Sequence, residues 1–206
     1  MNRTPQEFKH DIRTILGQRD RGRRNNAASR RGVMPPENGE FSEELMCAAV
    51  LVPLLLKEGE WHVLVTQRTQ TVEHHKGQIS FPGGACDPDD ADLLATALRE
   101  TFEEVGVPPE AVEVLGTLDD FPTITSFIVT PFVGVIPHPF AYRLNRSEVA
   151  AVVEVPLSFL RDPAHLRKER WEVEGRVHDV LFWDYGPYTI WGATARILKS
   201  FLDLVY

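Results

Sequence analysis

Residues 81–106 read FPGGACDPDDADLLATALRETFEEVG, which predicts a strand end, a glycine turn and a helix in succession. The helix is expected from Leu94 to Val105, because apolar side chains recur at spacings of three and four. Five side chains share one arc of this helix and should face a core: Leu94, Leu98, Thr101, Phe102 and Val105. Gly106 follows where a helix usually ends, and two prolines after it prevent the helix from resuming.

The opposite side of this predicted helix carries three carboxylates within a narrow arc. Glu100, Glu103 and Glu104 would repel one another at these spacings, by roughly 0.2–0.5 kcal/mol per pair in isolated helices. A divalent cation would relieve the repulsion, and the hard oxygen ligands of carboxylates suit Mg²⁺ or Mn²⁺. The alternative interpretation is that these glutamates form an ordinary solvated face. The paired glycines before the helix allow close backbone approach, so the Gly84 carbonyl could meet the same ion.

The segment from Gly84 to Val107 resembles the Nudix box, a glycine followed by a spaced Arg-Glu-x-x-Glu-Glu-x-Gly helix. The resemblance implies an α/β (α+β) fold, an α/β/α sandwich with a mixed β-sheet. It also implies a pyrophosphatase that acts on a nucleoside diphosphate linked to another group. The loop before Arg99 is one residue longer than in the usual box, and it lacks the Glu that the box usually has between its glycine and its arginine. Asp90 or Asp92 could take the structural place of that Glu.

The composition, 43% hydrophobic and 25% charged over 206 residues, is typical of a globular protein with one domain and an extension. No run approaches the roughly 18 apolar residues of a membrane span, and no N-terminal signal is visible. The net charge of −8 argues against general nucleic-acid binding. Cys47 and Cys86 are the only cysteines, so we expect no disulfide framework and a location in the reducing cytoplasm.

Positive charge is concentrated in the segment 19–31, where six arginines and one aspartate give a charge of +5. The segment could be a solubilising, partly disordered arm or a phosphate-attracting rim over the active site. RNA binding is a third interpretation, weakened by the lack of interleaved aromatic residues. A short helix from Thr4 to Leu16 precedes the segment, with Phe8, Ile12 and Ile15 on one face. We therefore divide the chain into an N-terminal helix and arginine-rich arm, residues 1–40, and a Nudix hydrolase domain, residues 41–206.

The remaining elements follow from apolar runs, alternation and turn residues. Strands are expected over 48–56, 61–67, 111–118, 128–137 and 149–155, a hairpin over 171–185, and a final helix over 190–205. Strands mixed with few helices predict a mixed sheet between helices, the same fold that the resemblance implies.

Segments outside the box resemble the coenzyme A pyrophosphatase branch of the Nudix family. They are residues 63–68, 75–84, 118–120, 130–134 and 190–198. The resemblance implies cleavage of coenzyme A into 3′,5′-ADP and 4′-phosphopantetheine. Whether thioesters of coenzyme A are also cleaved is left open. We expect substrate contacts at Arg68, Lys76, Gly77 and Gln78, with structural pairing as the alternative for Arg68. The branch usually has an Arg five residues after Arg68; here that residue is Glu73, so a neighbour such as Lys76 would have to compensate.

A divalent cation would neutralise the pyrophosphate oxygens and lower the pKa of a bound water. We expect Glu100, Glu103 and Glu104 to hold Mg²⁺ or Mn²⁺, with the Gly84 carbonyl as a further ligand. Glu100 and Glu104 rank above Glu103, because residues four apart face each other most directly on a helix.

Two further residues complete the predicted site. Arg99 is expected to orient a glutamate through its fork of donors, with a surface salt bridge as the alternative. The general base is expected to be a glutamate of the helix, Glu100 or Glu103, or Glu148, which opens an apolar strand; a solvated loop glutamate is the alternative for Glu148.

The leading function is therefore a divalent-metal-dependent coenzyme A diphosphatase. The alternatives are a Nudix hydrolase of another dinucleotide, such as NADH or ADP-ribose, and a nucleotide sensor without catalysis. The expected partner is a small-molecule nucleotide rather than nucleic acid or a membrane, and a homodimer is left open.

Overall fold

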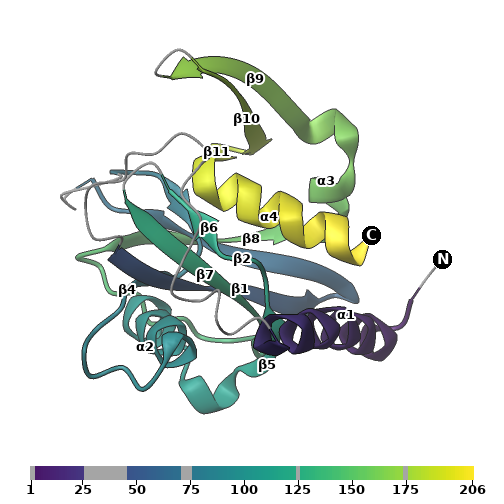
Figure 1. Ribbon diagram of the computed structural model, residues 1–206, viewed down its shortest axis with the longest axis vertical. Helices are drawn as coiled ribbons and strands as arrows, with labels where there is room; N and C mark the ends of the chain where they lie inside the picture. Colours follow the sequence, from purple (N-terminus) through teal and green to yellow (C-terminus); the bar gives the residue numbers. More distant parts are fainter. Residues whose placement is uncertain (1–2, 26–45, 71–75, 124–125, 174–175) are drawn as a thin grey trace.

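The computed structural model describes residues 3–25, 46–70, 76–123, 126–173 and 176–206 (Figure 1). Four α-helices lie in these ranges: α1 (Pro5–Asn25), α2 (Leu93–Val105), α3 (Leu157–Arg161) and α4 (Gly192–Val205). The strands of the first half are β1 (Met46–Lys57), β2 (Glu60–Arg68), β3 (Ile79–Ser80), β4 (Gly83–Ala85), β5 (Glu113–Thr117) and β6 (Phe121–Pro122). Those of the second half are β7 (Phe127–Val135), β8 (Val149–Pro156), β9 (Leu166–Val173), β10 (Arg176–Tyr185) and β11 (Tyr188–Trp191).

The main sheet is built around β1, the long apolar strand. β1 pairs in parallel with β7 and antiparallel with β2, and the strand order is β3-β2-β1-β7-β5. Towards one end of the sheet, β3 pairs with β2 and β4 pairs with β1, while β8 pairs with the other edge of β2. Parallel and antiparallel pairs thus occur in one sheet, which confirms the predicted mixed sheet.

Helices cover both faces of this sheet, with α2 on one side and α4 on the other (Figure 1). The alternation of side chains along the strands divides the core accordingly. On the α2 side, Leu51, Leu55 and Leu64 pack with Val105. On the α4 side, buried strand residues pack with the helix; they include Val52, Leu54, Val63, Val65, Leu198 and Phe201. The α/β/α sandwich expected from the sequence is confirmed.

A second sheet has three strands in the order β11-β10-β9. β9 and β10 pair antiparallel, which confirms the hairpin predicted over 171–185, whereas the third strand β11 was not predicted. This sheet lies beyond α4 in Figure 1. The final helix was expected to begin at Ile190, but Tyr188–Trp191 pairs with β10 and the helix begins only at Gly192, whose φ is 65°. The β-favouring residues of this segment pair across a short turn, and that pairing outweighs the helical spacing.

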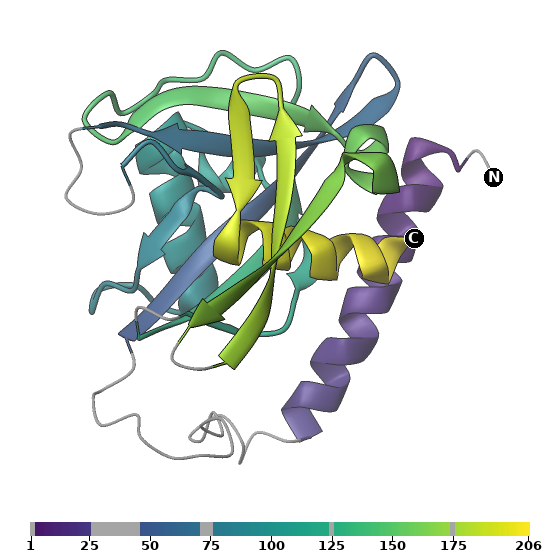
Figure 2. The same cartoon turned by 90° about the horizontal axis from the view of Figure 1, so that it is seen from above.

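Helix α1 is longer than predicted and belongs to the main core. Phe8, Ile12 and Leu16 are buried in the α4-side core, whereas Ile15 is only half-buried. The Phe8 ring lies 5.4 Å from Trp61, and Figure 2 shows α1 passing beside the end of α4. The expectation of a helix outside the body is therefore corrected. The proposed boundary at residues 40 and 41 lies outside the described residues and stays a prediction.

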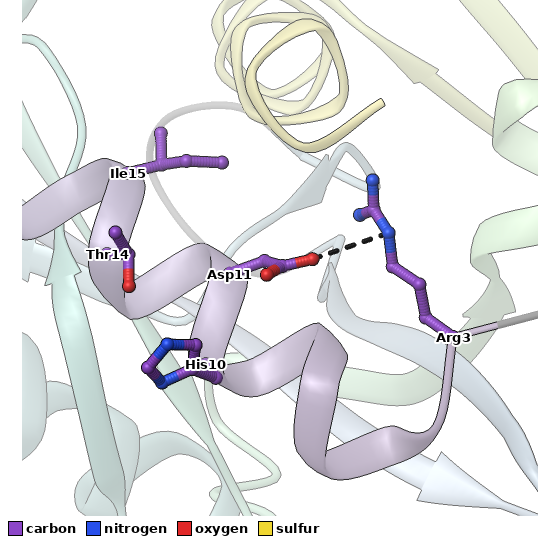
Figure 3. A pocket seen from close by; sticks show the side chains of 5 residues that line it. All are labelled: Arg3, His10, Asp11, Thr14 and Ile15. Atoms are coloured by element: carbon purple, nitrogen blue, oxygen red, sulfur yellow. Dashed lines mark ion pairs between the residues drawn. The ribbon is translucent and has the colours of Figure 1, made fainter.

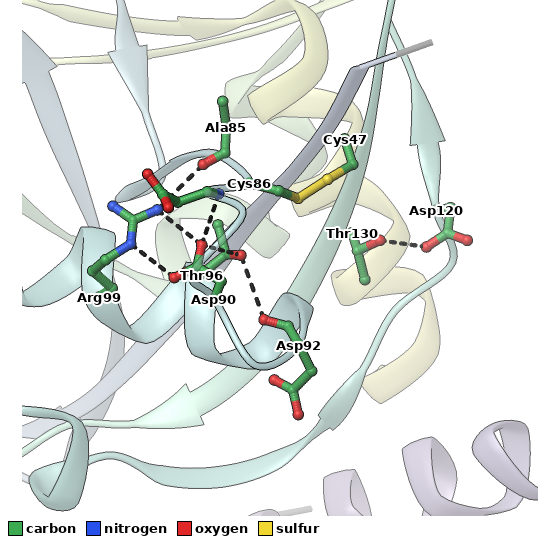
Figure 4. The surroundings of a disulfide bond; sticks show 10 residues. Cys47, Ala85, Cys86, Asp90, Asp92, Thr96, Arg99, Asp120 and Thr130 are labelled. Atoms are coloured by element: carbon green, nitrogen blue, oxygen red, sulfur yellow. Dashed lines mark hydrogen bonds and ion pairs between the residues drawn. A yellow bond between two sulfur atoms is a disulfide. The ribbon is translucent and has the colours of Figure 1, made fainter. Parts of the chain in front are cut away.

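Cys47 and Cys86 form a disulfide, contrary to our expectation (Figure 4). The β1–β4 pairing aligns Ala48 with Ala85, and this brings the flanking cysteines to a Cα–Cα distance of 5.6 Å. The two residues are 39 positions apart, and nothing in their local sequence predicts that they meet. Among the described helices, none has the length and hydropathy of a membrane span. The cytoplasmic location stays a prediction.

Candidate active site

Helix α2 begins and ends at identifiable caps. The Asp92 side chain accepts a hydrogen bond from the Ala95 N–H at 2.8 Å, and Gly106 closes the helix in the left-handed region with φ 79°. Asp92 is thus a helix cap rather than the replacement for the missing Glu of the box.

The predicted core face of α2 is correct only in part. Thr101 and Val105 are buried and the two leucines of the arc are half-buried, but Phe102 is 41% exposed. The Arg143 guanidinium lies 5.8 Å from the centre of the Phe102 ring on the outer side of the helix. The sheet contacts an arc of α2 rotated away from Phe102 and towards Glu104.

Glu104 is buried, with only 2% of its surface exposed. Its Oε2 atom has no hydrogen-bond partner among the described residues. Burial raises the pKa of Glu104 to about 8, and the charges of Glu100, Glu148 and Glu103 act in the same direction against the opposing Arg68. In the ionised carboxylate, Oε2 would lack both water and a donor within the described part of the chain, so it calls for a cation.

Glu100 lies against the glycine strand β4. A Cβ atom added to Gly84 would come within 2.6 Å of the Glu100 carboxyl carbon, so a side chain at this position would overlap the carboxylate. Burial also raises the pKa of Glu100, an effect that Arg99 opposes. The paired glycines led us to expect a close approach of the backbone at this point. The group that approaches the Gly84 backbone is the Glu100 carboxylate.

Arg99 joins the helix carboxylates to the loop before α2. Its Nη1 donates to Glu100 Oε1 at 2.8 Å and to Glu103 Oε2 at 3.2 Å. Its Nε and Nη2 donate to the two Asp90 oxygens at 2.9 and 3.0 Å, and Nη2 also reaches the Ala85 carbonyl at 3.3 Å (Figure 4). Arg99 holds the pKa of Asp90 well below its usual range. Asp90 is therefore the loop carboxylate that fixes Arg99 in the longer box loop.

The three box glutamates do not point to one common position. Glu103 is half-exposed and turns towards Arg99, whereas Glu104 points into the core. Within the ranges that the structure describes, no group of three or more His, Cys, Asp and Glu side chains is arranged to hold a metal ion. Glu100 and Glu104 nevertheless fit a divalent cation as a pair, because one lies against the Gly84 backbone and the other has an unpartnered buried oxygen.

A second wall of the site comes from the end of β2 and the start of β8. Glu148 immediately precedes β8, and its carbonyl accepts a hydrogen bond from the Thr69 N–H at 2.8 Å. Its charge acts on both Glu100 and Glu104. Arg68 ends β2, with its Nε buried and unpartnered within the described part of the chain, and its charge lowers the pKa of Glu104. The structure thus brings Arg68 and Glu148 to the helix carboxylates, and the roles predicted for them stay predictions.

The remaining predicted substrate contacts lie beside Arg68. The Arg68 N–H donates to the Gln78 carbonyl at 2.9 Å, and the Gly77 N–H donates to the Thr69 carbonyl at 3.3 Å. Gly77 has φ 69°, and a Cβ there would lie 2.4 Å from the Gln70 amide nitrogen. Lys76 is exposed at the start of this turn, while Glu73 lies outside the described residues.

Sequence reasoning missed one residue of the site, Asn145. Its Nδ2 donates to Glu148 Oε1 at 3.1 Å, and its Oδ1 accepts from the Ser147 N–H at 3.2 Å. The signal was present, because an Asn side chain often hydrogen-bonds the main chain two residues on, as Asn145 does with Ser147, and so fixes the loop that carries Glu148.

The described surface also has hollows away from these residues. One is a shallow pocket on α1, lined by Arg3, His10, Asp11, Thr14 and Ile15 (Figure 3). Another is a groove at β6, β10 and α4, lined by residues that include Phe121, Leu181, Arg196 and Lys199. Neither contains a residue that the sequence assigned to the site.

Comparisons with known proteins show the family of this chain. The NUDIX domain model matches residues 46–173. The uncharacterized Nudix hydrolase NudL of Enterobacter sp. is 45% identical over 158 residues, which cover 74% of this chain and 79% of that protein. The NudL of Cronobacter sakazakii is 42% identical, covering 84% and 89%. The crystal structure of a NUDIX hydrolase from Alicyclobacillus acidocaldarius superimposes with a TM-score of 0.53 at 23% identity, covering 79% and 93%. The chain therefore belongs to the Nudix hydrolase family.

Proposed function

We propose that this protein is a divalent-metal-dependent coenzyme A diphosphatase that yields 3′,5′-ADP and 4′-phosphopantetheine. The observation that carries the metal-dependent reaction is the buried Glu104 Oε2 atom, which has no partner in the described part of the chain and lies one helical turn after Glu100, the carboxylate against the Gly84 backbone. The choice of coenzyme A rests on the sequence motifs around Arg68 and Gly77, which resemble those of the coenzyme A pyrophosphatase branch.

Glu100 and Glu104 would hold Mg²⁺ or Mn²⁺, with the Gly84 carbonyl as a further ligand, and Glu103 could join them only by turning away from Arg99. The cation would neutralise the diphosphate oxygens and lower the pKa of a bound water. Arg99 orients Glu100 through its 2.8 Å hydrogen bond and is itself held by Asp90. Glu148 is our choice of general base over Glu100 and Glu103, because it faces the helix carboxylates from a separate wall and does not pair with Arg99.

Substrate recognition is assigned to Arg68 and to the turn formed by Lys76, Gly77 and Gln78. Coenzyme A carries a 3′-phosphate that NADH and ADP-ribose lack, so its recognition needs cationic groups. Arg68 has a buried Nε without a partner in the described part of the chain, and Lys76 is exposed at the turn.

One observation favours a second substrate class. Glu73 stands where the branch usually has an Arg, and an acidic residue would disfavour an extra phosphate. Hydrolysis of NADH or ADP-ribose is therefore the alternative function. A nucleotide sensor without catalysis is disfavoured, because Glu100, Glu103 and Glu104 are all present.

The test is a product assay with coenzyme A, NADH and ADP-ribose at equal concentration and saturating Mg²⁺, with chromatographic identification of the nucleotide released. We expect coenzyme A to give 3′,5′-ADP with the highest kcat/KM. A higher kcat/KM for NADH or ADP-ribose would transfer the assignment to the alternative, and no turnover of any of the three would favour the sensor.

A further inference from the structure

The loop before β8 is attached to the C-terminal end of α2 by two main-chain hydrogen bonds. The Arg143 N–H donates to the Val105 carbonyl at 3.0 Å, and the Asn145 N–H donates to the Glu104 carbonyl at 2.9 Å. These bonds satisfy carbonyls that the last turn of a helix leaves without intrahelical partners. The backbone of Asn145 is therefore fixed relative to Glu104, on the helix that carries the metal-binding pair.

The Asn145 side chain has two separate tasks in this loop. Its Oδ1 accepts from the Ser147 N–H at 3.2 Å and from the Ser147 hydroxyl at 2.6 Å, which closes the turn. A backbone N–H can only donate, so the atom facing it must be the amide oxygen. The amide nitrogen is then the atom that faces Glu148, and it donates to Glu148 Oε1 at 3.1 Å. One side chain thus both closes the turn and binds the carboxylate.

We infer that Asn145 is a positioning residue, which holds the Glu148 carboxylate in place for its work on the attacking water. The inference rests on the proposed role of Glu148 as general base. Glu148 is only half-buried, and its side chain has several rotatable bonds that would otherwise move it away from the helix carboxylates. The hydrogen bond from Asn145 removes this freedom, and catalytic groups misplaced by about 1 Å can lose about 10²-fold in rate.

The same contacts make a purely structural role distinguishable from positioning. Turn closure uses Oδ1 and the main chain of Asn145, whose carbonyl accepts from the Glu148 N–H at 3.0 Å, whereas the contact with the Glu148 carboxylate is made by Nδ2. Asn145→Asp keeps an acceptor for the Ser147 N–H and keeps the size of the side chain. It replaces the donor facing Glu148 with an oxygen that repels the carboxylate. Ser147→Ala is the matched control, because it removes a hydrogen bond on the turn side of Asn145 and leaves Nδ2 in place.

The experiment is a double-mutant cycle on the full chain, with Asn145→Asp, Glu148→Gln, the double variant and Ser147→Ala. Turnover is measured on whichever of coenzyme A, NADH and ADP-ribose the wild type cleaves, so failure of the substrate assignment does not affect the cycle. We expect Asn145→Asp to lower kcat by about 10–100-fold, because a hydrogen bond to a charged group is lost. The KM of Asn145→Asp should stay within about 3-fold of the wild-type value, and the kcat of Ser147→Ala should also stay within about 3-fold of the wild type.

The decisive result is the double variant. If Asn145 acts through Glu148, adding Asn145→Asp to Glu148→Gln costs no further kcat, because the positioned carboxylate is already absent. If the role of Asn145 is only structural, Asn145→Asp should lower kcat by the same factor in the Glu148→Gln background as in the wild type. That result, or a kcat of Asn145→Asp within about 3-fold of the wild type, would overturn the inference. If circular dichroism shows that Asn145→Asp is unfolded, Asn145→Ser replaces it in the cycle, since serine can close the turn but is too short to reach Glu148.

Discussion

Replacing Glu104 by glutamine should stabilise the metal-free protein at neutral pH. The pKa of Glu104 is raised from 4.5 to about 8 by burial, so at pH 7 the folded state holds a proton that the unfolded chain has released. Holding that proton costs about 1.4 kcal/mol per pH unit above 4.5, which amounts to about 3 kcal/mol at pH 7. The buried glutamine amide lacks a partner for its donors, a loss of about 1–2 kcal/mol. The net gain at pH 7 is therefore about 1–2 kcal/mol.

The sign of the pH dependence follows from the raised pKa. The contribution of Glu104 to stability is complete below pH 4.5 and is lost as the pH rises through about 8. The free energy of unfolding of the wild type minus that of Glu104→Gln should thus fall by about 1.4 kcal/mol per pH unit between pH 5 and 8, and level off above pH 8. Urea unfolding of both proteins in EDTA, from pH 5 to 9, measures this difference. A difference that does not change with pH would refute our account of Glu104 as a buried, uncompensated carboxyl group.

Three further predictions test other parts of the account. Glu100→Gln should lose most activity at saturating Mg²⁺ while its melting temperature stays close to that of the wild type; near-normal turnover would remove Glu100 from the metal site. Phe8→Ala should lower the free energy of unfolding in urea by about 3–5 kcal/mol, because Phe8 is buried in the main core. For the same reason, deletion of residues 1–31 should leave no independently folded body. An unchanged urea midpoint in Phe8→Ala would show that helix α1 does not stabilise the core. 3′-Dephospho-coenzyme A should show a kcat/KM about 10–100-fold below that of coenzyme A, and Lys76→Ala should narrow that gap; equal values in the wild type would remove the 3′-phosphate from recognition.

The elements that could be predicted are those whose signals are local. The limits of α2 follow from Asp92, Gly106 and the apolar spacing between them. The long strand β1 follows from its continuous apolar run, since a strand covered on both faces needs no alternation. The box helix and glycine turn were therefore found by sequence alone, together with the mixed sheet between helices.

The features that were missed depend on where other parts of the chain lie. Helical spacing gives the angle between Glu100 and Glu104, about 40°, but not which arc the sheet covers. The sheet covers the arc that includes Glu104 and leaves Phe102 exposed. The disulfide needs the pairing of β1 with β4, and the burial of α1 needs its contact with β5 and α4, so neither is visible in a local pattern.

The most direct test of the central claim is Mn²⁺ binding, measured by electron paramagnetic resonance on the metal-free protein. Because Glu100 and Glu104 are the expected ligands of the cation, Glu104→Gln should weaken the binding at least about 10-fold. Glu110→Gln is the control, because Glu110 is an exposed carboxylate in the turn after α2 and should leave the affinity within about 2-fold of the wild type. Equal Mn²⁺ affinity in the wild type and in Glu104→Gln would contradict the claim that this buried glutamate helps to hold the metal.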